Sequence, residues 1–369
     1  MTATETQYFT LLRAALWNTQ PTLADHVDWE GVMRIAEHHG NAALLADVAT
    51  RLTDGNKPEP EMLAKMMTGM RSNLFNQMHL KQILVSAVKL LREHDIEPVL
   101  LKGFSLAMLY PNPNVRQFGD IDLFVRRDKF HEACRLLRSL PGGYNWGEET
   151  DIGRHYNIEF GQYPMEVHRV SADEIDSDEE GVYAPIEQEG LTDEARRVRW
   201  EGLEITVPSK EFMVFFTFFH AWHHFLTTGV GLRQLSDVAI TLHSYHGQLD
   251  LDKLHRYLET MHVMEPWQAF GNLLVSCLGL PAGEMPFGAT ISPRRQRKLY
   301  ECIMEEGNFR RRRRFKTNRP KQRLLQKMHA FICIFIDFFH LAKTFPKQAF
   351  RGLHSEFRQA FRKNLHGSP

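Results

Sequence analysis

Two aspartates stand two residues apart inside an apolar run, and this pattern restricts the local fold more than any other part of the chain. The run covers residues 119–125 and reads GDIDLFV. Strand side chains alternate between faces, so Asp120 and Asp122 are predicted to point one way while Ile121 and Leu123 point the other. Two carboxylates on one face repel each other, and a divalent cation relieves that repulsion. Hard oxygen ligands suit Mg²⁺ or Mn²⁺, so the pattern predicts a metal site.

A third carboxylate is expected from a neighbouring strand, because sites with two metals usually need one. Glu166 is the preferred candidate, since it shares a strand face with His168 while Met165 and Val167 occupy the other face. If this strand pairs beside residues 120–125, Glu166 completes the ligand set. The alternatives are an ordinary solvent-facing glutamate at this position and Glu159 as the third ligand.

A lysine and a glycine end the short apolar run at 96–101, where a strand is expected to turn into a helix. Free backbone N–H groups and the helix dipole at such a turn favour phosphate. Gly103 allows close approach of a phosphate group, and Ser105 can add a hydroxyl. Lys102 and Arg116 supply positive charge, so these residues predict a triphosphate site next to the carboxylates.

Together these elements resemble the polymerase-beta-type nucleotidyltransferase superfamily. They more closely resemble a bacterial nucleotidyltransferase family marked by a Leu-Lys-Gly turn, an Arg, a Gly-Asp-Ile-Asp-Leu run and Glu-x-His. In this chain the marks are residues 101–103, Arg116, residues 119–123 and residues 166–168, and the resemblance continues through His220 and residues 231–237. It covers about residues 75–285 of this sequence.

The resemblance implies an enzyme that moves a nucleoside monophosphate from an NTP to an acceptor, with pyrophosphate as the leaving group. It implies two Mg²⁺ (or Mn²⁺) ions held by Asp120 and Asp122. Glu166 would hold the metal that activates the acceptor hydroxyl, and Gly103 and Ser105 would meet the triphosphate.

We therefore expect an α+β fold, with a small mixed β-sheet nucleotidyltransferase core flanked by N- and C-terminal helical regions. The expected division is a helical region over 1–95, the core over 96–208, a helical domain over 209–290 and a basic helical tail over 291–369. Apolar periodicity predicts helices over 61–94, 128–140, 212–226, 232–245, 251–261 and 266–278, and strands over 96–101, 120–125, 154–160, 165–170 and 203–208. The last strand is expected at a sheet edge, Asp128 and Ser209 are expected to cap helices, and residues 173–189 are expected to form an acidic loop.

Further candidates come from the helical part. His220, His223 and His224 fall on one helix face. A zinc site would need more ligands, so packing or substrate contact is preferred, with His220 or His224 lining the cleft. Arg233 is expected either to reach a phosphate from the helical side or to pair with Asp237 at i, i+4. His168 is assigned, with Arg233, to the nucleotide-binding group.

The C-terminal part is strongly basic although the whole chain has 45 basic and 45 acidic residues. Residues 291–369 hold 20 Lys/Arg against 5 Asp/Glu, which leaves 25 against 40 in residues 1–290. The centre of this tail is the arginine run 310–314, close to an apolar segment at 330–342. An acidic membrane surface, nucleic acid, another protein and the acidic body of the chain itself all fit as its partner.

The four cysteines are scattered without a CxxC pair, which argues against a zinc ribbon or a disulfide framework. Residues 1–20 lack a basic start followed by an apolar block, so no secretory signal is visible. Cytoplasmic residence is the expectation, with attachment to the periphery of a membrane left open.

Two classes of function stay open at this stage. The preferred one is a metal-dependent nucleotidyltransferase with an unidentified acceptor, which includes a toxin-like transferase that modifies RNA. The alternative is a non-catalytic module that kept the fold and senses a nucleotide or binds an anionic surface. The sequence specifies neither the nucleotide, nor the acceptor, nor the oligomeric state.

Overall fold

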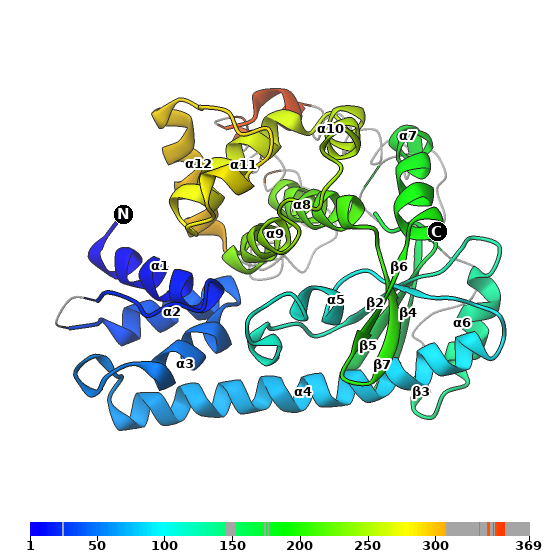
Figure 1. Cartoon of the computed structure of the whole chain (residues 1–369), viewed down its shortest axis with the longest axis horizontal. Coiled ribbons are helices and arrows are strands. Elements are labelled where there is room, and N and C mark those ends of the chain that lie inside the picture. Colours follow the sequence, from blue (N-terminus) through cyan, green and yellow to red (C-terminus); the bar gives the residue numbers. More distant parts are fainter. Residues whose placement is uncertain are drawn as a thin grey trace.

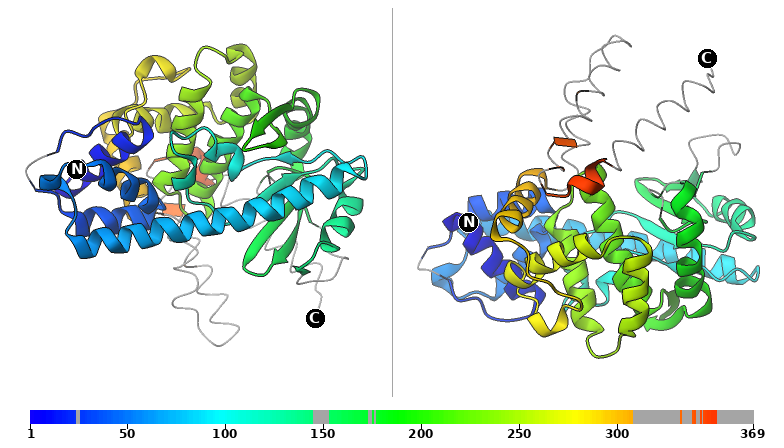
Figure 2. Two further views of the ribbon diagram at one scale, coloured as in Figure 1. Left: turned by 60° about the horizontal axis from the view of Figure 1, so that its bottom comes forward. Right: turned by 90° about the horizontal axis from the view of Figure 1, so that it is seen from above.

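A computed structural model describes most of the chain: residues 1–23, 26–144, 153–172, 175, 177–307, 332, 338, 339, 342 and 344–350. The described part is a mixed α/β structure with three helices at one end and a β-sheet at the other (Figure 1). The helix α4 runs along one side of the molecule from the first three helices to the sheet, as the rotated view in Figure 2 also shows. The helices α7 to α12 lie on the other side (Figure 1).

The helices have these bounds: α1 Ala3–Leu16, α2 Trp29–His39, α3 Ala42–Arg51, α4 Pro60–Arg92, α5 Phe104–Ala107, α6 Phe130–Arg138, α7 Ser177–Gln188, α8 Lys210–Thr227, α9 Leu232–Ser244, α10 Leu251–Thr260, α11 Met264–Ser276 and α12 Pro293–Glu306. Shorter turns are η1 Asp54–Asn56, η2 Pro113–Val115, η4 Glu189–Asp193 and η5 Ala282–Glu284. The strands are β1 Val99–Leu100, β2 Ile121–Phe124, β3 Gly143–Tyr144, β4 His155–Phe160, β5 Tyr163–His168, β6 Arg196–Trp200 and β7 Leu203–Val207.

Among the residues that the structure describes, the sheet has seven strands in the order β3-β4-β5-β2-β1-β7-β6. The strand β2 pairs in parallel with β5, and β1 pairs in parallel with β7, whereas the other neighbours are antiparallel. The mixed sheet with helices around it confirms the expected α+β fold. In the β2–β5 pair, Asp122 stands directly beside Glu166. This register positions the candidate site.

Local sequence explains the long helix α4. Pro60 occupies its first turn, where the missing N–H costs nothing. Leu80, Leu84 and Leu91 recur at helical spacing and are fully buried. The expected helix over 61–94 is therefore confirmed to within a turn.

The helices after the sheet also follow the expected pattern. The Ser209 side chain accepts a hydrogen bond from the Phe212 N–H at 3.3 Å and so caps α8, as predicted. The helix α8 is buried along most of its length because aromatic side chains such as Phe215 and Phe218 pack against neighbouring helices. Within the described part of the chain, no helix is long and apolar enough to span a bilayer.

Three expectations about the core region are wrong. The strand β7 lies inside the sheet, because the strand β6, whose residues 196–200 are rich in arginine, forms the edge. Charged side chains on an edge strand prevent pairing with other chains. Because they replace apolar residues, the apolar pattern did not predict this strand. The helix α6 begins at Phe130, since the Asp128 carboxylate binds Arg126 and does not cap the helix.

The third correction concerns the acidic segment 173–189, which was expected to be a loop. Its described residues from 177 onward form α7 and enter η4. Tyr183 and Ile186 are buried, and the Tyr183 ring stacks on Phe219 of α8 with 5.9 Å between ring centroids. Burial of these two apolar side chains outweighs the poor helix propensity of Gly181 and Pro185.

The arginine run 310–314 lies outside the described residues, and so does most of the apolar segment 330–342. The basic tail and its partners therefore stay predictions. The expected domain boundaries at 95, 208 and 290 also stay predictions.

Candidate active site

The three predicted acidic residues meet at one cavity. Asp122 lies on β2 and Glu166 lies beside it on β5, while Asp120 immediately precedes β2. Residues paired across neighbouring strands project to the same face, so the in-register parallel pair brings the two carboxylates together. The cavity has a volume of about 380 Å³. It is lined by Lys102, Gly103, Leu106, Arg116, Phe118, Asp120, Asp122, His155, Glu166, Ser171, Ala172, Phe216, Thr217, Phe219, His220, His223, His224, Arg233, Gln234 and Asp237.

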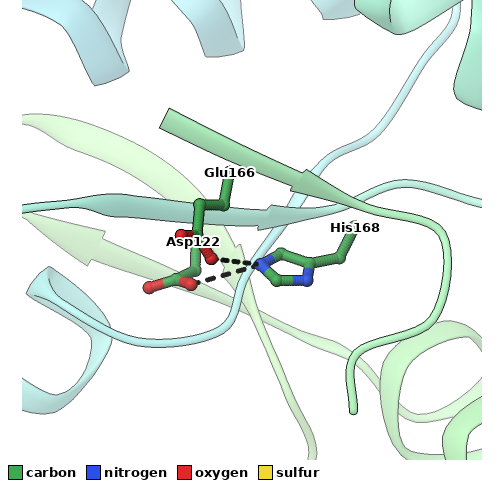
Figure 3. Close-up of side chains that lie close together, drawn as sticks. All are labelled: Asp122, Glu166 and His168. Atoms are coloured by element: carbon green, nitrogen blue, oxygen red, sulfur yellow. Dashed lines mark hydrogen bonds and ion pairs between the residues drawn. The ribbon is translucent and has the colours of Figure 1, made fainter. Parts of the chain in front are cut away.

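Asp122 is the most buried member of this group. Its Oδ1 atom lies 2.9 Å from Lys102 Nζ and 3.2 Å from His168 Nε2. The same His168 nitrogen lies 3.5 Å from Glu166 Oε2, so the imidazole bridges the two carboxylates (Figure 3). Asp122 Oδ2 is buried and has no hydrogen-bond partner among the described residues. A buried carboxylate oxygen without a partner costs free energy unless a cation or donor reaches it.

The donor set fits a hard divalent cation. Asp122, Glu166 and His168 each offer a ligand atom, and these atoms all lie within 4.8 Å of one another. Asp120 adds a third carboxylate at the same cavity. Carboxylate oxygens are the preferred ligands of Mg²⁺ and Mn²⁺, and the unpartnered Asp122 Oδ2 is available for one.

The carboxyl groups of the site differ in the direction in which their pKa values are shifted. Burial alone would raise the pKa of Asp122, but the Lys102 ammonium and the His168 imidazole lower this pKa to about 2. Burial raises the pKa of Asp120 and of Glu166, and the negative charge of Asp122 raises both further. Lys102 is therefore the main positive charge that offsets the cluster. The remaining repulsion is what a bound divalent cation would relieve.

The glycine turn borders the same cavity. Gly103 has a φ of 70°, a left-handed conformation that favours glycine, and a Cβ here would lie 3.4 Å from the Asp120 carbonyl oxygen. The turn leads directly into α5, a helix of four residues. Lys102 and Gly103 thus both lie where the sequence pattern predicted, next to the carboxylates.

Arg116 reaches the cavity but is already paired. Its Nε and Nη2 atoms donate to the two oxygens of Asp237 at 2.6 and 2.9 Å, and its Nη1 atom donates to the Gly103 carbonyl at 3.1 Å. The Tyr110 hydroxyl donates to Asp237 Oδ1 at 2.8 Å. Asp237, on α9, therefore holds the glycine turn through Arg116. The sequence analysis did not predict the pairing of Arg116 with Asp237.

Two other predicted residues differ in their placement. The Ser105 hydroxyl is buried, donates to the Leu101 carbonyl at 3.1 Å, and is not part of the cavity lining. Arg233 does line the cavity, and its Nη1 atom donates to the Gln117 carbonyl at 2.6 Å. The expected pairing of Arg233 with Asp237 is replaced by the Arg116–Asp237 pair.

The helix α8 contributes the remaining wall of the cavity. His220, His223 and His224 line it, as the sequence analysis predicted for His220 or His224. His155, from β4, was missed. It pairs with His168 in the β4–β5 register and so lies on the Glu166 face of the sheet, and the alternation of polar and apolar residues over 155–160 is the sequence signal for that face. Ser171 was also missed, because no local pattern identifies a loop residue that follows β5.

A family model described as "Uncharacterised nucleotidyltransferase" matches residues 25–279, which is more than half of the chain. The chain belongs to this nucleotidyltransferase family. The match confirms the expected nucleotidyltransferase family, and its range includes every residue of the cavity lining.

Two solved structures are similar to this chain at low sequence identity. The antibiotic-resistance factor ANT(2'')-Ia shares 12% identity, with 50% of this chain and 94% of that chain covered and a TM-score of 0.35. An antigenic nucleotidyltransferase-like protein from Paracoccidioides brasiliensis shares 15% identity, with 55% and 92% covered and a TM-score of 0.34. Both scores are below 0.5, so the assignment rests on the family match. No curated protein matches the sequence.

Proposed function

We propose that this protein catalyses metal-dependent transfer of a nucleoside monophosphate from an NTP to a hydroxyl group of an acceptor, with release of pyrophosphate. The observation that carries the proposal is the register of β2 and β5. It puts Glu166 beside Asp122, whose Oδ2 atom has no partner among the described residues, in a cavity shared with the Lys102–Gly103 turn.

In this proposal Asp120, Asp122 and Glu166 hold Mg²⁺ or Mn²⁺. When bound, the metal neutralises charge on the triphosphate and lowers the pKa of the attacking hydroxyl. His168 orients the Asp122 and Glu166 carboxylates through its Nε2 atom.

The chain's own cations position the nucleotide. Lys102 Nζ lies 2.9 Å from Asp122 Oδ1 and would supply positive charge to a phosphate oxygen beside the carboxylates. The Gly103 backbone lies close enough to the cavity for a phosphate group to contact it, and Arg233 supplies charge from α9. Arg116 acts indirectly, because Asp237 already neutralises its charge. Its Nη1 atom donates to the Gly103 carbonyl and so holds the glycine turn in place. Ser105 has no role in this scheme.

The test uses each of the four NTPs labelled at the α-phosphorus, incubated with purified protein, Mg²⁺ and a cell extract as the source of acceptor. We expect label transfer and pyrophosphate release that are lost in Asp120→Ala/Asp122→Ala and in Glu166→Gln. Glu159→Gln is the matched control, since Glu159 lies on the adjacent strand β4 and does not line the cavity. We expect this variant to keep the activity.

Labelling that is equal in the wild type and the double aspartate variant would remove the proposal. Nucleotide binding by calorimetry without any pyrophosphate release would instead favour the nucleotide-sensing alternative. Loss of activity in Glu159→Gln but not in Glu166→Gln would move the third carboxylate to β4.

A further inference from the structure

A pair of histidines lies in the cavity without a role in the proposed metal and triphosphate sites. His220 and His224 stand one helical turn apart on the α8 face that lines the cavity. Their Nε2 atoms are 3.0 Å apart, and His224 Nδ1 lies 2.7 Å from the Thr228 hydroxyl oxygen. Thr228 follows the last residue of α8. The three side chains thus form one hydrogen-bonded chain that starts inside the cavity.

This hydrogen-bonded chain of side chains constrains which ring nitrogens of His220 and His224 carry a hydrogen. A hydrogen bond between two Nε2 atoms needs a hydrogen on one of them and a lone pair on the other. When His224 Nδ1–H donates to Thr228, His220 Nε2–H donates to His224 Nε2, and His220 Nδ1 keeps its lone pair. Among the described residues, no other hydrogen bond reaches the His220 ring. This tautomer therefore leaves a proton acceptor at the cavity.

The surroundings keep His220 neutral when no nucleotide is bound. Burial lowers the pKa of His220 well below 6.5, and the positive charges of Lys102 and Arg233 and the neighbouring His223 and His224 lower it further. Lys102 and Arg233 are the cations that the proposed function assigns to the triphosphate. A bound triphosphate would offset their charge and make a protonated His220 more favourable. The imidazole would thus become a better base once the nucleotide is in place.

We infer that His220 is the general base that takes the proton of the acceptor hydroxyl, and that His224 and Thr228 carry this proton away. The inference rests on the proposed function and adds the acceptor side of the same site. The hydroxyl proton moves to His220 Nδ1 while the acceptor oxygen bonds the α-phosphorus. The bond between the α-phosphorus and the bridging oxygen breaks, and pyrophosphate leaves with that electron pair. The Nε2 proton of His220 passes to His224 Nε2, and the Nδ1 proton of His224 passes through Thr228 to solvent.

The test measures transfer from ATP labelled at the α-phosphorus to glycerol, which serves as a hydroxyl probe, in the full-length protein. We expect His220→Ala to lower kcat by about 100-fold or more, the usual contribution of a general base, with KM for ATP little changed. Free imidazole should restore a large part of the lost rate, because it can occupy the vacated space. A merely structural role of His220 would not produce rescue by a base.

The control is His243→Ala. His243 lies on α9 with its side chain half exposed, interacts with Glu284 and does not line the cavity. We expect this variant to match the wild type, with or without imidazole. His224→Gln should lower kcat less than His220→Ala, since the His220 lone pair stays and only the exit of the proton changes.

Circular dichroism and binding of a non-hydrolysable ATP analogue establish that each variant is folded. A folded His220→Ala protein that keeps its kcat, or that imidazole does not restore, overturns the inference alone. A wild-type protein whose transfer does not depend on Asp120 and Asp122 overturns the proposed function as well, so the two failures are distinguishable.

Discussion

Replacement of Asp237 by asparagine tests the buried ion pair that joins α9 to the glycine turn. The Asp237 and Arg116 side chains are only 5% and 4% exposed. Asp237 accepts two hydrogen bonds from Arg116 and one from the Tyr110 hydroxyl. The substitution keeps the size of the side chain but removes its charge and one acceptor atom. It leaves the Arg116 guanidinium buried without an opposite charge in contact.

The expected cost follows from this geometry. Breaking a buried ion pair by removing one partner destabilises a protein by about 3–5 kcal/mol, because an uncompensated charge stays in a low-dielectric environment. Arg116 keeps one hydrogen bond, to the Gly103 carbonyl, and the asparagine oxygen can still accept one more. We therefore expect Asp237→Asn to lower the free energy of unfolding by about 3 kcal/mol, at the lower end of that range.

Urea unfolding followed by tryptophan fluorescence measures this loss. The matched control is Asp128→Asn, which breaks a pair of similar chemistry between Arg126 and Asp128 whose side chains are 62% and 57% exposed. We expect no measurable change there, since solvent screens an exposed pair. Equal midpoints and slopes for Asp237→Asn and the wild type would refute the reasoning, because they would mean that Arg116 does not depend on Asp237 for its charge balance.

Three further changes probe other parts of the molecule. Burial lowers the pKa of His39 from 6.5 to about 3, so the unfolded chain binds the extra proton first as the pH falls below 6.5. Stability should then drop by about 2 kcal/mol between pH 7 and pH 5, and urea titrations of His39→Gln should show a correspondingly flatter pH dependence. Gly190→Ala would bring a Cβ within 2.3 Å of Phe212 and should lower the free energy of unfolding by about 2 kcal/mol. Gly181→Ala has open space around it and should stabilise α7 by about 0.5 kcal/mol. A higher thermal unfolding midpoint for Gly190→Ala than for Gly181→Ala would contradict the packing around Gly190. Ser105→Ala should remove only a buried hydrogen bond of about 1 kcal/mol and leave KM for ATP unchanged, and a large rise in KM would place this hydroxyl on the triphosphate.

Local pattern was sufficient for most elements of the fold. Alternation along 119–125 predicted which side of β2 is polar, and helical spacing predicted α4 and the helices from α8 to α11. These patterns are readable because the period of side-chain direction belongs to the backbone itself. The approach failed for β6 and α7, where charged residues dominate and a few buried side chains decide the structure.

The sequence alone predicted the chemistry of the candidate site, because the Asp-x-Asp strand, the Glu-x-His strand and the Lys-Gly turn are local patterns and each indicates a type of ligand. Only the tertiary structure decided which of these residues are neighbours in space. It paired β2 with β5 in register and set the histidines of α8 against the same cavity. It also paired Arg116 with Asp237, 121 residues away, a contact that the sequence analysis did not predict. The reason is that periodicity records the face of an element, whereas a partner distant in sequence is selected by the packing free energy of the whole chain.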